Sequence, residues 1–296
     1  MKKIACILLA LFLVMPAVSL AELEEEELEV EELDLGSGEE AAAAPEAFGE
    51  TASGGEAVWN FPVALEDMNP EYIILANKHY LLDKKYVPKD LVKVPSKPKE
   101  GGIKWAVKPK DGQKLRKECA EALCALNQAI RDEAEEYGYR DLYLKSAYRS
   151  YSTQNTMYKN RLKKNKGKDD GWVSKPGASD HQTGLGCDGV PSNWKDKAMN
   201  DKMMKEPECV WMAEHCYEFG FIIRYPEDKQ EITEINTEPW HLRYVGIPAA
   251  TYIWENNLCL EEFTEQLQQA IEEYLAAGGD RAKVEAFIQT STDEEQ

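Results

Sequence analysis

The sequence predicts an α+β fold in which a small antiparallel sheet is flanked by helices. Long amphipathic patterns and short alternating patterns follow one another along the chain without regular strand–helix–strand units. Hydrophobic residues make up 43% of the 296 residues, which is enough for a sizeable core. Acidic residues outnumber lysine and arginine by 54 to 35, but the terminal segments carry this excess, and residues 57–265 hold 33 acids and 31 bases. A nearly neutral domain argues against a nucleic-acid partner, because binding to nucleic acid depends on many cations.

The first 21 residues have the pattern of a secretory signal peptide. Lys2 and Lys3 precede an apolar run from Ile4 to Val14, and Ser19-Leu20-Ala21 is a small-x-small cleavage site. The alternative is an uncleaved anchor helix, but the apolar run lies at the short end of the ~17–25 residues that span a bilayer. We therefore expect an exported protein, in the cell envelope or outside the cell, with no stable membrane span after cleavage.

Three further segments follow the signal peptide. Residues 22–56 contain 14 acidic residues and no lysine or arginine, which predicts a disordered, self-repelling linker. Residues 57–265 are expected to form the folded domain. Residues 266–296 are expected to form a C-terminal helical extension and an acidic tail, since apolar residues recur every four positions from Phe263 to Leu275, as on one face of a helix.

Four helices and four strands are expected within the folded domain. Helical periodicity covers residues 112–137, Ser152 is suited to cap a helix that runs to residue 165, and Gly220 ends a helix over 207–219. A fourth helix is expected over residues 248–257. Short apolar or alternating runs predict strands over residues 142–147, 184–190, 221–225 and 241–245.

The cysteines leave the disulfide pattern open. Apart from Cys6 in the signal peptide, the chain contains Cys119, Cys124, Cys187, Cys209, Cys216 and Cys259. Export would allow disulfides, but five residues of helix separate Cys119 from Cys124 by roughly 7.5 Å, beyond the usual reach of a disulfide. Cys209 and Cys216 fail the same test if their helix is unbroken. Buried free thiols are an equally good interpretation.

Two of the four histidines have unusually specific neighbours. His181 lies in the segment Ser179-Asp180-His181-Gln182-Thr183-Gly184-Leu185-Gly186-Cys187-Asp188, and His241 ends the segment Glu238-Pro239-Trp240-His241. Two imidazoles and the Asp188 carboxylate are a ligand set suited to a catalytic zinc ion, because three protein ligands leave the fourth position open for water. Glu238, three residues before a ligand, can lie beside that water.

The local spacing is compatible with one shared ion. On a straight strand His181 and Asp188 would lie on opposite faces, so a turn or bulge near Thr183-Gly184 is needed to bring both side chains together. Gly186 would keep side-chain bulk away from the metal. His79 and His215 have no such neighbours and are interpreted as ordinary surface or core histidines.

Together with an upstream Tyr148-Arg149-Ser150, these motifs resemble the VanY-type D-alanyl-D-alanine carboxypeptidases. This family belongs to the LAS group of zinc peptidases (lysostaphin, D-Ala-D-Ala peptidases, sonic hedgehog). Its Ser-x-His-x-x-Gly-x-Ala-x-Asp motif is matched by Ser179 to Asp188, with Gly186 in place of the usual Ala. Its Glu-x-Trp-His motif is matched by Glu238 to His241. Its Tyr-Arg-Ser followed by Gln is matched by Tyr148 to Gln154, and the whole resemblance extends over about residues 70–265.

The resemblance implies a LAS/hedgehog-like fold and a role for each matched residue. Zinc would be bound by His181, Asp188 and His241, with Glu238 as the general base. Arg149 would face the scissile carbonyl oxygen. The substrate would be held by Gln154, Ser179, Tyr148 and Ser150. The implied activity is zinc-dependent removal of the C-terminal D-Ala from peptidoglycan stem peptides, by a protein expected to be a monomer.

Several alternatives stay open at this point. Cleavage of a D,D bond is favoured over cleavage of an L,D bond, but motifs do not separate the two. A peptidoglycan endopeptidase of the same fold is a further possibility. A non-catalytic module that binds the cell wall would be indicated by loss of a metal ligand or of the base, and none of these residues is lost.

Overall fold

The computed structural model describes residues 57–96, 108–110 and 112–292. The predicted signal peptide, the acidic linker and residues 293–296 of the acidic tail lie outside these ranges. Across the ranges that are described, no helix has both the length and the apolar composition needed to cross a bilayer.

In the described part of the chain, five strands form the main sheet. Their order is β2 (Lys108–Pro109), β4 (Leu142–Ser146), β5 (Gly186–Pro191), β7 (His241–Tyr244) and β6 (Phe221–Ile223). The strands from β4 to β6 pair antiparallel, whereas β2 pairs with β4 in parallel. Every residue of the central strand β5 is buried. The mixture of helices with a small, mainly antiparallel sheet confirms the predicted fold class.

A second, two-stranded sheet was not predicted from the sequence. Strand β1 (Leu91–Lys93) pairs antiparallel with β3 (Lys114–Arg116). The helix expected from residue 112 therefore begins later, as α1 (Lys117–Asp132), because pairing with β1 holds the preceding residues in an extended conformation. A short helix α2 (Ala134–Tyr137) follows and ends at Gly138, which adopts a left-handed conformation with φ 72°.

The remaining helices differ from the prediction mainly at their ends. Helix α3 (Tyr151–Lys164) is capped by Ser150 and not by Ser152, because the Ser150 hydroxyl accepts a hydrogen bond from the Thr153 amide at 3.3 Å. Helix α4 (Pro207–His215) continues as a 3₁₀ turn that ends at Gly220, as expected. The other helices are α5 (Gln230–Thr233), α6 (Ile247–Glu255), α7 (Leu260–Ala276) and α8 (Arg281–Val284).

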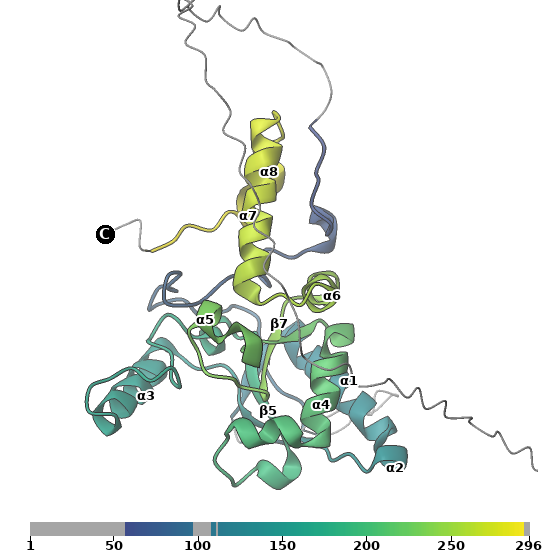
Figure 1. Ribbon diagram of the computed structural model, residues 1–296, viewed down its shortest axis with the longest axis vertical. Coiled ribbons are helices and arrows are strands. Elements are labelled where there is room, and N and C mark those ends of the chain that lie inside the picture. Colours follow the sequence, from purple (N-terminus) through teal and green to yellow (C-terminus); the bar gives the residue numbers. More distant parts are fainter. Residues whose placement is uncertain (1–56, 97–107, 111, 293–296) are drawn as a thin grey trace, which may run out of the picture. The chain divides into compact units, whose positions relative to one another are not determined.

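The first hydrophobic core lies between the main sheet and helices α1 and α4. Leu123 and Leu126 of α1 and Met212 of α4 pack in one buried cluster with Leu144 and Leu242 of the sheet. Figure 1 shows α1 and α4 on one side of β5 and β7, and α3 on the other side. This core fixes the strands that carry the functional residues described below.

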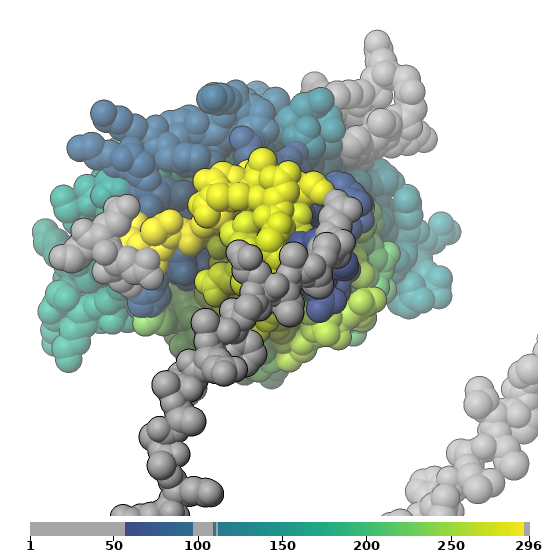
Figure 2. Space-filling view, turned by 90° about the horizontal axis from the view of Figure 1, so that it is seen from above, coloured from purple at the N-terminus to yellow at the C-terminus, as the bar shows by residue number. Residues whose placement is uncertain are grey.

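A second hydrophobic core joins the two ends of the described chain. Phe61 and Ile73 from the N-terminal segment pack with Phe263, Leu267 and other apolar residues of α6 and α7. Figure 2 shows the C-terminal helices beside these N-terminal residues. The domain boundary expected between residues 265 and 266 falls inside α7, so the residues on both sides of it share one helix and one core.

The six described cysteines are all buried, and none of them is joined in a disulfide. This finding favours the free-thiol interpretation over a disulfide framework. Burial raises the pKa of the Cys209 and Cys216 thiols to about 12. A thiol that stays protonated is a poor nucleophile, so neither cysteine is suited to covalent catalysis.

We expect Leu267→Ala to lower the free energy of unfolding by about 2–5 kcal/mol, because it leaves a cavity in the second core. Leu267 is 0% exposed, although it lies in the segment predicted as an extension. Urea denaturation followed by tryptophan fluorescence would measure the change. Glu272→Ala, at an exposed position of the same helix, is the control and should have an effect within about 0.5 kcal/mol. Equal stability of the two variants would show that α7 is not part of the cooperative core.

Candidate metal centre

A short turn brings His181 close to strand β5. Residues Asp180–Thr183 form a 3₁₀ turn that ends at Gly184, whose φ of 71° is left-handed. The Thr183 hydroxyl donates to the Asp180 carbonyl at 2.6 Å and accepts from the Leu185 amide at 3.0 Å. The sequence analysis predicted a turn near Thr183-Gly184, and this turn leads directly into β5.

Strand pairing places the other two predicted ligands opposite each other. Asp188 of β5 lies directly across from His241 of β7. The Asp188 Oδ1 atom is 3.3 Å from His241 Nδ1 and 3.5 Å from His181 Nε2. The ligand atoms of all three residues lie within 4.8 Å of one another. The structure therefore brings together the three residues that were predicted to hold a metal.

The donor atoms of this cluster fit a bound cation. His181 Nδ1 lies 2.7 Å from the Ala147 carbonyl oxygen, so Nδ1 carries the proton and Nε2 presents its lone pair towards Asp188. Asp188 Oδ1 is buried and has no hydrogen-bond donor among the described residues. Two imidazoles and one carboxylate, with a fourth position facing a pocket, are the donor set of a catalytic zinc site, and zinc is the metal that this site fits.

Burial and neighbouring charges set the protonation of the two histidines differently. Burial, with the nearby Arg149 cation, lowers the pKa of His181 to about 4, so its ring is neutral and ready to bind a metal. Burial also disfavours the charged form of His241, but the Asp188 and Glu238 carboxylates, each 3.3 Å from His241 Nδ1, outweigh it and raise the pKa to about 9. A metal that binds His241 Nδ1 must therefore displace a proton at neutral pH.

Glu238 lies beside the cluster without belonging to strand β7. Its Oε2 atom is 3.3 Å from His241 Nδ1, and its backbone carbonyl accepts from the His241 amide at 3.0 Å. Burial raises the pKa of the Glu238 carboxyl group above its ordinary value. A carboxylate with a raised pKa next to a metal position can accept a proton from water and release it again.

Arg149 and Gln154 form one wall of the pocket in front of the cluster. An Arg149 guanidinium NH₂ group donates to Gln154 Oε1 at 2.7 Å, and the other donates to the Ser146 hydroxyl at 3.1 Å. Gln154 in turn donates to the Ser174 carbonyl at 2.7 Å. Gln154 thus holds the guanidinium in place, and burial lowers the pKa of Arg149.

The pocket has a volume of about 190 Å³ and contains seven of the nine residues predicted for the site. These are Arg149, Gln154, Ser179, His181, Asp188, Glu238 and His241. Tyr148 and Ser150 do not line the pocket, and the prediction that they hold the substrate finds no support here. The hydroxyl of Ser150 is used to cap α3, and the backbone amide of Tyr148 donates to the Lys114 carbonyl.

The other two histidines lie outside this cluster, as expected. His79 is half-exposed beside Glu234, and His215 Nδ1 lies 2.9 Å from Glu218 Oε1.

The sequence analysis missed several residues that line the metal pocket, namely Met157, Trp172, Val173, Ser174, Met199, Tyr225, Ile235 and Trp240. Trp240 was visible within the second motif, but Trp172 and Met199 lie in irregular segments that have no periodic pattern to identify them.

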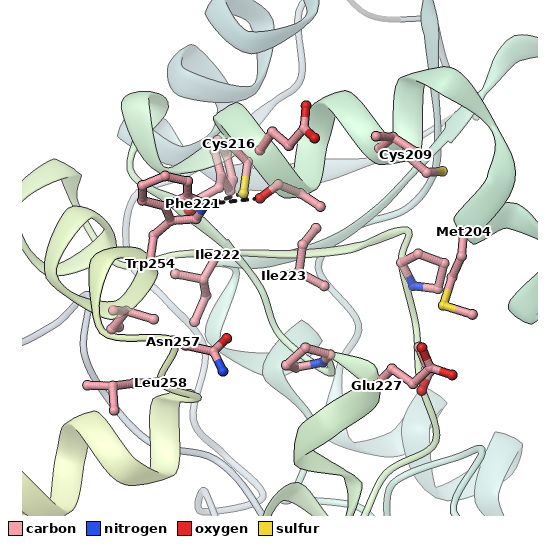
Figure 3. A pocket seen from close by; sticks show the side chains of 17 residues that line it. Met204, Cys209, Cys216, Phe221, Ile222, Ile223, Glu227, Trp254, Asn257 and Leu258 are labelled. Atoms are coloured by element: carbon pink, nitrogen blue, oxygen red, sulfur yellow. Dashed lines mark hydrogen bonds between the residues drawn. The ribbon is translucent and has the colours of Figure 1, made fainter. Parts of the chain in front are cut away.

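A larger apolar cavity of about 400 Å³ lies on the other side of residues 237–239. Thr237 and Pro239 line this cavity, whereas Glu238 lines the metal pocket, so alternate residues of this segment face the two spaces. Figure 3 shows mainly apolar side chains around the cavity, including Ile222 and Trp254. Among the described residues, the only group with metal-binding geometry is the His181, Asp188 and His241 cluster.

Comparison with known proteins places this site in a family. Residues 112–247 match the family profile of VanY, D-alanyl-D-alanine carboxypeptidase. YodJ of Bacillus subtilis (strain 168), named as a candidate carboxypeptidase, is 38% identical over 204 residues, which cover 68% of this chain and 70% of YodJ. The chain belongs to the VanY family. The resemblance inferred from the motifs is thereby confirmed.

Two further relatives extend this comparison. The bifunctional D-Ala-D-Ala dipeptidase and D-Ala-D-Ala carboxypeptidase VanXYC of Enterococcus gallinarum is 35% identical over 137 residues, covering 46% of this chain and 72% of VanXYC. The structure of the LD-carboxypeptidase LdcB is 38% identical and superposes with a TM-score of 0.53, covering 67% of this chain and 87% of LdcB. The protein is thus a carboxypeptidase of the VanY family, and its His181, Asp188 and His241 cluster has the donor set of a zinc site.

We expect Gly186→Ala to weaken zinc binding at least tenfold, even though Ala is usual at this position of the VanY motif. A Cβ atom at Gly186 would lie 2.8 Å from Asp180 Cβ and 3.0 Å from the Asp180 carbonyl carbon, so the turn that carries His181 must shift. Chelator competition would measure the loss. Such displacement of ligand-supporting groups typically weakens metal binding by about 10–100-fold.

Gly189→Ala is the matched control on the same strand. A Cβ atom there would make only ordinary contacts, 3.7 Å from Leu142 and from Leu242. Zinc affinity of this variant should stay at the wild-type value. If both variants bind zinc like the wild type, the close packing of the turn on β5 does not constrain the metal centre.

Proposed function

We propose that the protein is an exported zinc carboxypeptidase that removes the C-terminal D-Ala from peptidoglycan stem peptides. The observation that carries this proposal is the presence of a complete catalytic set in one pocket. Three metal-binding side chains, the Glu238 carboxylate and the Arg149 guanidinium all line it. The charge pattern of residues 1–21 supports export, and membership of the VanY family supports the substrate class.

The chemistry follows from the position of each side chain. Zinc bound by His181, Asp188 and His241 would polarise the scissile carbonyl and supply a water whose pKa is lowered to about 7. Glu238 accepts the proton of the attacking water and returns it to the leaving amine. Its raised pKa brings proton transfer closer to neutral pH. Arg149 donates to the carbonyl oxygen as negative charge develops on it, and such a donor is typically worth about 3 kcal/mol in the transition state.

The same wall of the pocket is suited to a substrate that ends in a carboxylate. Arg149 is partly buried and cationic, and its guanidinium is held in a fixed orientation by Gln154 and Ser146. Ser179 adds a hydroxyl group to the pocket lining. Donors that are already oriented bind an anion without a further loss of side-chain entropy. This arrangement favours an exopeptidase over an endopeptidase.

Cleavage of a D,D bond is the first candidate and cleavage of an L,D bond the second. Both substrates end in D-Ala and differ in the preceding residue. The name of VanXYC refers to D-Ala-D-Ala, whereas LdcB is named an LD-carboxypeptidase. The match to LdcB covers 67% of this chain, and the match to VanXYC covers 46% of it. Parallel assays of pentapeptide and tetrapeptide stems would decide between them. A non-catalytic role in wall binding is disfavoured because the base and all metal-binding residues are present together.

We expect Glu238→Ala to keep zinc but to lose turnover by about 10²–10⁴-fold, because Glu238 transfers protons and is not needed as a ligand. Zinc content and kcat would be measured on the same preparation. His181→Ala and His241→Ala should each lose zinc and activity together, while His79→Ala and His215→Ala should retain both. Release of zinc from Glu238→Ala would make Glu238 a ligand and Asp188 the better candidate for the base.

A stem peptide that ends in free D-Ala should be cleaved, with release of one D-Ala that is abolished by a chelator and restored by zinc. The same peptide with an amidated C-terminus should be cleaved at least tenfold more slowly in kcat/KM. A charge-assisted hydrogen bond contributes about 1.5–3 kcal/mol, and amidation removes the charge that the pocket donors bind. Equal cleavage of both peptides, or cleavage inside cross-links, would exclude the carboxypeptidase mechanism and favour an endopeptidase.

A further inference from the structure

Four charged side chains form a buried cluster behind the turn that carries His181. We call Asp180, Arg224, Arg243 and Glu261 the charged quartet. Asp180 and both arginines are 0% exposed, and the Glu261 side chain is 11% exposed. The Asp180 carboxylate accepts from Arg224 Nε at 2.8 Å with one oxygen and from Arg243 with the other. None of these residues lines the metal pocket.

The quartet connects the metal-binding turn to segments outside the family match. Arg224 donates to both oxygens of Glu261 in α7, at 2.7 and 2.6 Å. Arg243 donates to the carbonyl oxygens of Tyr72 and Ile74, at 2.9 and 2.6 Å. The family profile covers residues 112–247, so both flanking segments reach the centre of the domain through these bonds.

Each member of the quartet except Glu261 is close to a metal-binding segment. Asp180 directly precedes His181, and Arg243 follows His241 by two residues on β7. The Arg224 amide donates to the His241 carbonyl at 3.0 Å. The Arg224 guanidinium also lies 4.8 Å from the centroid of the Tyr225 ring, which in turn is 5.0 Å from the His241 ring. A displacement of Arg224 or Asp180 is therefore transmitted directly to the metal ligands.

The charges of the quartet cancel. The Asp180 carboxylate lies between both guanidinium groups, with one oxygen 2.8 Å from Arg224 Nε and the other 2.5 Å from an Arg243 NH₂ nitrogen. Both Glu261 oxygens accept from Arg224, which lowers the pKa of the Glu261 carboxyl group against the effect of burial. Two anions thus balance two cations. Removing the Glu261 carboxylate would leave two buried guanidinium groups sharing the single charge of Asp180, and this excess positive charge is strongly unfavourable and would repel a metal cation nearby.

We propose that Glu261 is a positioning residue for the metal centre, which it maintains by neutralising Arg224. With Arg224 neutralised, the Asp180 carboxylate stays shared between the two arginines, and the turn presents His181 Nε2 towards Asp188. Without Glu261, the two Arg224 NH₂ groups lose their carboxylate partner, and Asp180, which Arg224 already contacts through Nε at 2.8 Å, must balance both arginines. The inference rests on the ligand set proposed above and is independent of the substrate.

The test measures zinc affinity of the full chain by competition with a chromogenic chelator. Glu261→Gln keeps the size of the side chain and removes its charge, and it should weaken zinc binding at least tenfold. Glu265→Gln removes the same charge from an exposed position of the same helix and should bind zinc like the wild type. Equal affinity of the two variants would overturn the proposal.

A second substitution tests whether the excess positive charge of the two arginines is the cause. The double variant Glu261→Gln with Arg224→Met removes both partners, so Asp180 keeps Arg243 and the cluster is again neutral. Its zinc affinity should return to within about threefold of the wild type. Glu261→Asp, which keeps the charge, should also bind more tightly than Glu261→Gln. If the double variant binds no better than Glu261→Gln, charge balance is not the mechanism.

The outcomes also separate this role from folding and from the ligand assignment. If Glu261→Gln does not fold, as judged by circular dichroism, the double variant decides the matter: folding with near-wild-type affinity supports the proposal, and failure overturns it. His181→Ala is measured beside them. Retention of zinc by His181→Ala would refute the ligand set, whereas loss of zinc there with normal binding by Glu261→Gln would refute only the positioning role.

Discussion

The register between β5 and β7 is the constraint on which the metal centre depends. Asp188 faces His241 across the two strands, and the neighbouring pairs in the same register place Leu242 opposite Cys187, both of them fully buried. A slip by one residue would move Asp188 to the opposite face of the sheet, among the apolar residues of the first core. The hydrophobic core that α1 and α4 make with the sheet thus fixes the distance between two metal ligands. The packing of β5 and β7 in the core and the geometry of the metal centre therefore depend on the same strand pairing.

Electrostatic balance around the site is achieved at two levels. In the pocket, the Asp188 carboxylate lies between two imidazoles, so its negative charge is available to a cation while one ring stays neutral. Behind the pocket, buried arginines and carboxylates neutralise one another and hold the backbone of the ligand-bearing segments. The side chains in the pocket supply the candidate ligands. The buried ion pairs behind the pocket keep these ligands in place without competing for the metal. Arg149 stands apart from both, because it lines the pocket and its two NH₂ groups donate to Gln154 and Ser146.

The sequence predicted the metal cluster better than it predicted the periphery of the domain. His181, Asp188 and His241 were identifiable because the spacing and residue types of both motifs are demanding, and Gly184 marked the turn between two of them. Strand β1 and its partner β3 were missed because each is three residues long and is defined by pairing rather than by an alternating pattern. The charged quartet was invisible for a different reason. Arg224 and Glu261 are 37 positions apart, and only the packing of α7 makes them partners.

Under the export proposed above, the burial of the cysteines has a consequence for how the chain matures. Cys119 and Cys216 donate from Sγ to the carbonyl oxygens of Leu185 and Phe221, and the remaining described thiols are also enclosed in the interior. Disulfide-forming enzymes and peroxides react with the thiolate form of cysteine. Burial favours the protonated thiol and keeps these oxidants from reaching it. The folded domain therefore exposes no thiol to oxidants among its described residues. The vulnerable interval is the time before the core closes, when any two of the six thiols could be joined.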